Sequence, residues 1–73
     1  MTGIPQYERL ADAAFEAMYH APSRSAMKPH YEDACLYLSR AIDQAEQLSL
    51  ATEAARLSER LERIRGIYHS QFR

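Results

Sequence analysis

The last third of the chain carries an apolar residue at every third or fourth position, and this spacing restricts the fold more than any other feature. The steps are four, three, four, three, four and four residues, which is nearly the period of a coiled-coil seam. No stretch alternates apolar and polar residues as a strand would. The spacing predicts a helix over residues 52–72 and an apolar seam that begins just before it. The seam consists of Leu50, Ala54, Leu57, Leu61, Ile64, Tyr68 and Phe72.

Two earlier segments have the same period, and the few prolines separate them. Proline is favoured in the first turn of a helix, where its missing N–H needs no partner. Pro5 therefore predicts a helix over residues 5–21, and Pro29 predicts another over residues 29–48. The stretch 22–28 has no apolar period and is expected to be a connection. The predicted apolar faces are Tyr7, Leu10, Ala11, Ala14, Ala17, Met18 and Ala21 in the first helix, and Tyr31, Ala34, Cys35, Leu38, Ala41, Ile42, Ala45 and Leu48 in the second.

These helices predict an all-α fold, a small antiparallel three-helix bundle in which residues 1–73 form a single domain. The wide apolar arc of the second helix indicates contact with two neighbours, so that helix is expected to be central. Ser49 or Thr52 is expected to cap the third helix, which leaves a turn of about four residues before it.

Size and composition restrict the possible functions. A chain of 73 residues buries only about 60% of its unfolded surface and has little apolar material for a deep substrate cavity. No glycine-rich phosphate loop and no nucleophile with a base and an orienting group can be placed from spacing. We therefore expect no enzyme and no cofactor. No apolar run approaches the roughly 18 residues of a membrane span, and no signal peptide is recognisable, so a cytoplasmic location without a membrane partner is predicted.

The metal-binding residue types have poor spacing for a site. His20, His30 and His69 form none of the paired motifs that place two ligands on one helix face, so we predict no metal site. Cys35 lies within the apolar arc of the second helix, and we predict an inert core thiol rather than a nucleophile activated by the helix N-terminus.

The segment Tyr31-x-x-Ala34-x-x-x-Leu38-x-x-Ala41 resembles the second helix of a tetratricopeptide repeat and also that of a MIT domain. The aromatic, small, large, small order lets two helices approach closely. The resemblance covers about a third of the chain. It implies an antiparallel helical hairpin, and a helical module that binds proteins.

Two charged groups on the helices have alternative interpretations. Glu8, Asp12 and Glu16 form a ladder of carboxylates one turn apart, which we interpret as a solvated face rather than a site for a cation or a basic partner.

Arg56, Arg60 and Arg63 form a stripe on the third helix that can bind an anion. The favoured alternative is internal pairing, both with the acidic second helix and between Glu59 and Arg63. Nucleic-acid binding is disfavoured because the net charge is −1.

Four large apolar residues fall outside the predicted helix-packing faces. Phe15, Tyr19 and Leu36 are the main members, and Ile67 lies between the third helix's seam and the arginine stripe. Aromatic residues are enriched in interface cores. The competing interpretation is that Phe15 and Tyr19 pack on the connection over residues 22–28. We predict a non-enzymatic protein–protein interaction module or homo-oligomer that binds through these four residues; the alternative is anion or nucleic-acid binding through the arginine stripe.

Overall fold

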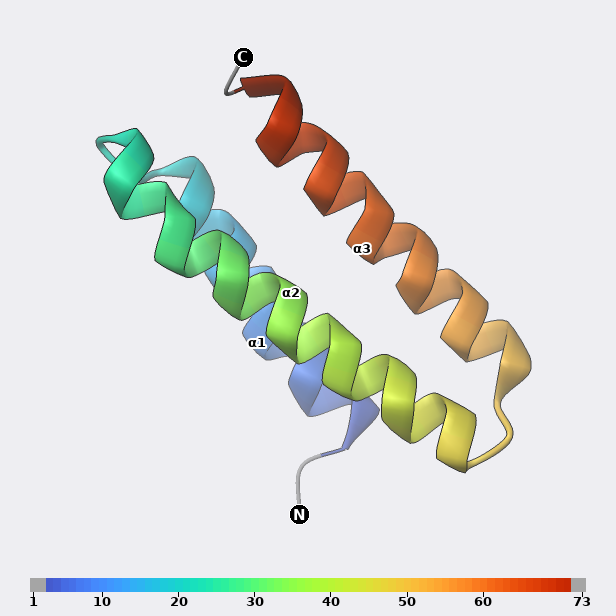
Figure 1. The fold of residues 1–73 in the computed structure, drawn as a ribbon. Coiled ribbons are helices and arrows are strands. Elements are labelled where there is room, and N and C mark those ends of the chain that lie inside the picture. Colours follow the sequence, from blue (N-terminus) through green and yellow to red (C-terminus); the bar gives the residue numbers. More distant parts are fainter. Residues whose placement is uncertain (1–2, 72–73) are drawn as a thin grey trace.

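The computed structural model describes residues 3–71, and every regular element in that range is a helix. α1 spans Ile4–Tyr19, α2 spans Arg24–Gln47 and α3 spans Ala51–Gln71. Figure 1 shows that each helix runs opposite to the one before it. α2 packs against both α1 and α3. The predictions of an all-α three-helix fold and of a central second helix are therefore confirmed.

Residues just before α1 and α2 determine where these helices begin. The Gly3 N–H donates a 3.0 Å hydrogen bond to Oε1 of Gln6. The Ala26 N–H donates a 3.2 Å hydrogen bond to Oγ of Ser23. Such bonds satisfy backbone donors at a helix start that have no partner within the helix.

The predicted connection over residues 22–28 is wrong. Residues 20–23 alone join α1 to α2, and Pro29 lies inside α2 instead of opening it. Because proline has no N–H, α2 lacks the bond that residue 29 would donate to the Ser25 carbonyl. The Ser23 cap and the burial of Met27 stabilise the start of α2 despite this loss. α1 also ends at Tyr19, two residues before the predicted boundary.

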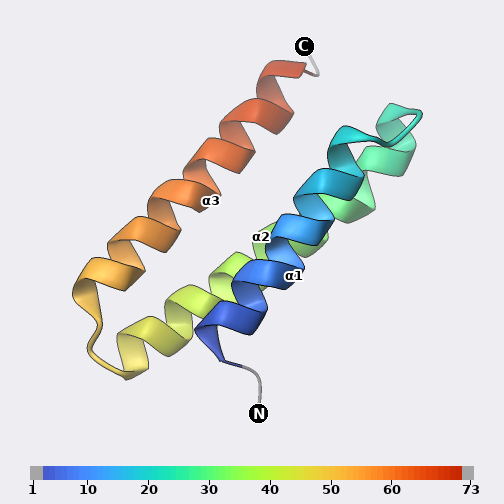
Figure 2. The same ribbon diagram turned by 180° about the vertical axis from the view of Figure 1, so that it is seen from behind.

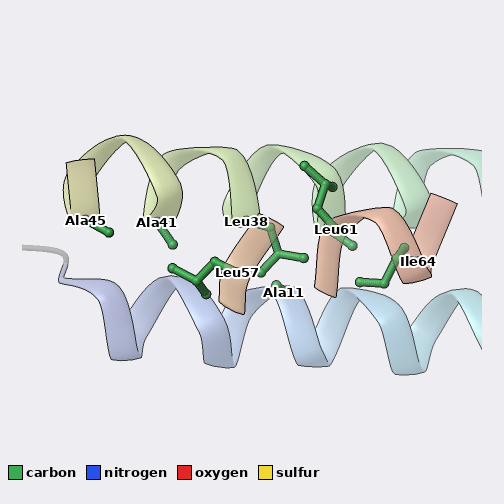
Figure 3. Packing of buried hydrophobic residues seen from close by; sticks show 8 residues of the cluster. Ala11, Leu38, Ala41, Ala45, Leu57, Leu61 and Ile64 are labelled. Atoms are coloured by element: carbon green, nitrogen blue, oxygen red, sulfur yellow. The ribbon is translucent and has the colours of Figure 1, made fainter. Parts of the chain in front are cut away.

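The core combines small residues between α1 and α2 with large ones from α3. Because alanine has a short side chain, the alanine-rich faces of α1 and α2 allow close approach of these two helices. Figure 3 shows the leucine and isoleucine side chains of α3 inserted between them. The buried cluster consists of Ala11, Ala34, Leu38, Ala41, Ala45, Leu57, Leu61 and Ile64.

Three leucines that the helical period assigned to the core are exposed instead. Leu48 and Leu50 flank the turn between α2 and α3, where no further helix extends to cover them. Leu10 is 43% exposed although the helical period placed it on the apolar face of α1. The predicted seam residue Phe72 lies outside the described residues.

Ser49 lies just after the C-cap of α2 and closes the end of that helix instead of capping the start of α3. Its backbone is left-handed, with φ of 58°. The Ser49 N–H donates to the Glu46 carbonyl at 3.0 Å, and the Leu50 N–H donates to the Ala45 carbonyl at 2.8 Å. This is the Schellman arrangement, which usually has glycine at this position. Since α3 begins at Ala51, the prediction that Ser49 or Thr52 caps it is wrong.

Candidate interaction groove between α1 and α3

α1 and α3 are joined mainly by long side chains, in contrast to the close packing of α1 on α2 and of α2 on α3. The Arg56 guanidinium donates two hydrogen bonds, of 3.1 and 2.6 Å, to the carboxylate oxygens of Glu8. Arg60 donates to Glu8 at 3.2 Å and also to Asp12. These ion pairs close one half of the boundary between α1 and α3.

The ion pairs change the acidity of the groups that form them. The hydrogen bond from Arg56 holds the pKa of Glu8 below its ordinary value, even though partial burial acts in the opposite direction. Arg56 also bonds Glu53, one turn earlier on α3, and lowers the pKa of that carboxyl. The carboxylates of Glu53 and Glu8 in turn raise the pKa of Arg56.

The sequence-based pairing of charges was wrong in three respects. Glu8 and Asp12 bind arginines although the Asp12 side chain is exposed, and only Glu16 of the ladder is solvated without an ion pair in the described range, as predicted. The arginines that they bind come from α3, so the electrostatic match is between the first and third helices rather than the second and third. The expected pair between Glu59 and Arg63 does not occur among residues 3–71.

The other half of the α1/α3 boundary is open. Phe15 of α1 and four residues of α3 line a hollow of about 210 Å³; the α3 residues are Arg60, Arg63, Ile64 and Ile67. The Tyr19 ring lies edge-on to Phe15, with 5.4 Å between centroids and an interplanar angle of 74°. Tyr19 is 56% exposed. We call the hollow together with Tyr19 the α1/α3 groove.

The groove brings together three of the four predicted interaction residues. Phe15 and Ile67 line the hollow beside Arg63 of the predicted arginine stripe, and Tyr19 lies against Phe15. Leu36 does not join them. It is 48% exposed, and at about 100° per residue it points away from the direction of the buried Leu38. The alternative that Phe15 packs on the connection over residues 22–28 is wrong for Phe15, which lines the hollow on α3, and residues 24–28 of that stretch belong to α2.

The three predicted arginines have different surroundings. Arg56 and Arg60 already bind carboxylates of α1. Arg63 is exposed and forms no ion pair within the described part of the chain. It is therefore the member of the stripe whose guanidinium is open to an external anion.

An aromatic cluster joins α2 to α3 at the same end of the bundle as the groove, near the start of α2 and the end of α3. Tyr31 and Tyr68 stack with 3.9 Å between ring centroids, and His69 lies edge-on to both rings. Burial and a hydrogen bond with Cys35 raise the pKa of Tyr31. Cys35 is half-buried beside this cluster, so its predicted burial is incomplete. The helical period placed both tyrosines on core faces, but stacking depends on the relative position of two helices.

Among residues 3–71, no three histidine, cysteine, aspartate or glutamate side chains gather in a way that would hold a metal ion. In the same range, no helix combines the length and the apolar character needed to cross a bilayer. No protein-family model, curated protein or solved structure matches this chain. The resemblance to tetratricopeptide repeats and MIT domains therefore stays a prediction.

Proposed function

We propose that this chain is a non-enzymatic, cytoplasmic interaction module that binds another protein surface through the α1/α3 groove. The observation that carries the proposal is the open hollow at which Phe15, Ile64 and Ile67 meet on the side of the bundle where the helices pack least closely. Apolar side chains beside a cation form the usual centre of a protein interface, where aromatic residues and arginine are enriched.

A site-specific cross-linking experiment tests this function. A photoreactive phenylalanine analogue replaces Tyr19 in one variant and Leu36 in a matched control, since the two side chains are 56% and 48% exposed. We expect light-dependent protein adducts in the source cell from position 19 and few from position 36. Absence of adducts from position 19, or equal yields from both positions, would contradict the proposal.

Anion or nucleic-acid binding is the second candidate, and it is favoured by Arg63, which is exposed and forms no ion pair within residues 3–71. The ion pairs of Arg56 and Arg60 weigh against it, because binding of phosphate would compete with the carboxylates of α1. A salt titration separates the candidates. Phosphate binding weakens steeply as salt rises, whereas apolar association does not.

A further inference from the structure

The two rims of the α1/α3 groove carry opposite charges without partners in the described chain. Glu16 of α1 is exposed and follows Asp12 by one turn, but it forms no ion pair with residues 3–71. Arg63 of α3 is likewise exposed and unpaired in that range. The ladder that joins Glu8 and Asp12 to arginines therefore stops where the apolar hollow begins.

Glu16 and Arg63 lie at similar heights along the groove. Figure 2 shows α1 and α3 running in the same direction, so their residues advance together. Asp12 pairs with Arg60, and one turn further Phe15 shares the hollow with Arg63. At about 100° per residue, Glu16 is rotated outward from Phe15, and Arg63 outward from the buried Ile64. The groove thus has an acidic rim on α1 and a basic rim on α3.

We propose that the α1/α3 groove is occupied by a second copy of this chain, related by a two-fold axis parallel to α1 and α3. The inference rests on the proposed function and names the partner. In this arrangement α1 of each copy faces α3 of the other. Arg63 of each copy then meets Glu16 of the other, and both unpaired charges are satisfied twice. A two-fold axis perpendicular to the helices would instead oppose like charges, which disfavours that register.

The apolar residues of the groove form the centre of this interface. Phe15 and Tyr19 of α1 in one copy pack against Ile67 of α3 in the other, between the two charge pairs. A standard interface buries about 800 Å² per partner, which is about a sixth of the 4950 Å² that this chain exposes. The groove occupies only part of the length of the helices, so we expect a weak dimer with a Kd of micromolar order.

Charge reversal tests the arrangement. The dissociation constant of the wild type, Glu16→Arg and Arg63→Glu is measured by sedimentation equilibrium from about 1 to 500 μM, a range that brackets micromolar affinity. We expect each single variant to dimerise about tenfold more weakly, because it places like charges opposite each other. An equimolar mixture of the two variants should form a heterodimer at least as tight as the wild type, because both cross-pairs then become attractive. Native mass spectrometry identifies this heterodimer.

Matched controls carry the same charge changes on the α2 surface around Leu36. Glu32→Arg and Arg40→Glu alter exposed residues that form no ion pair within the described chain, and they should leave the dissociation constant unchanged. All four positions are exposed, so circular dichroism should show an intact fold. Control variants as weak as the groove variants, or a mixture no tighter than its components, would overturn the arrangement.

The outcome of this experiment is separable from that of the cross-linking experiment. Suppose that the wild type is a monomer at 500 μM and that the adducts from position 19 differ in mass from two chains. The dimer proposal is then wrong, and the proposed function stands with a different protein as the partner. A monomer without adducts overturns both. A dimer whose adducts from position 19 have the mass of two chains supports both.

Discussion

The Arg56 guanidinium donates hydrogen bonds of 3.1 and 2.6 Å to the two carboxylate oxygens of Glu8, a residue 48 positions earlier in the chain. The two parallel hydrogen bonds of such a pair fix the relative orientation of the guanidinium and the carboxylate, and they stabilise the contact more than a single bond would. The pair joins the first helix to the third, two helices whose backbones make few close contacts. The arginine stripe is therefore partly structural, and the groove begins where these ion pairs end.

Replacing Glu8 should reduce the acid sensitivity of the fold. Because the pKa of Glu8 is lowered in the folded state, its contribution to stability is complete above the ordinary carboxyl pKa and disappears as the pH falls through the folded value. We expect Glu8→Gln to lower the free energy of unfolding by about 1 kcal/mol at pH 7 and to flatten its decline in acid. Urea denaturation between pH 2.5 and 7 measures both effects.

Glu32→Gln is the control for this prediction, since Glu32 of α2 is exposed, lies outside the groove and forms no ion pair in the described range; it should leave the acid profile of unfolding close to that of the wild type. Identical acid profiles for Glu8→Gln and the wild type would show that the network with Arg56 and Arg60 does not stabilise the fold.

Leu61→Ala should be among the most damaging single substitutions. Leu61 is 7% exposed and projects from α3 between the other two helices (Figure 3), and truncation of a buried leucine costs about 2–5 kcal/mol. Thermal denaturation followed by circular dichroism should show loss of helix near room temperature. Leu50→Ala belongs to the same predicted seam but is exposed, so it should have little effect. Equal melting temperatures for the two variants would refute this assignment of the core.

Ser49→Gly should stabilise the protein. Ser49 has a left-handed backbone with φ of 58°, and a residue with a Cβ pays about 1 kcal/mol for that conformation whereas glycine does not. The gain should appear as a higher urea midpoint with an unchanged slope. Ser58→Gly, in the middle of α3, should instead destabilise by a similar amount. A destabilised Ser49→Gly variant would contradict the left-handed turn.

Gly66→Ala should also stabilise the protein, by about 1 kcal/mol, because glycine is unfavourable inside a helix. A Cβ at Gly66 would meet no atom within 4 Å, so the gain carries no steric penalty. Gly3→Ala is the matched control. A Cβ there would lie 2.9 Å from Oε1 of Gln6 and disturb the cap of α1. If Gly66→Ala did not raise the unfolding midpoint, the open space that the structure shows around residue 66 would be wrong.

The fold class and most of the core follow from local patterns in the sequence. The recurrence of apolar residues at helical spacing is a local property, and it placed Ala11, Leu38, Leu57 and Ile64 correctly because each helix must bury one face. It could not locate the start of α2. The interior proline of that helix is tolerated because Ser23 caps the helix and Met27 is buried. The burial of Met27 depends on tertiary packing, which the local pattern does not contain.

The charge pairing and the candidate groove depend on how the helices are arranged in space. Glu8 and Asp12 repel each other along their own helix, and their arginine partners lie 48 or more positions away, so no local pattern identifies the match. Phe15 and Ile67 likewise looked like separate unexplained residues. They meet because the two connections each reverse the chain, so α3 lies beside α1 and runs in the same direction. Contacts between these two helices therefore join residues that are far apart in the sequence, and no local pattern identifies them.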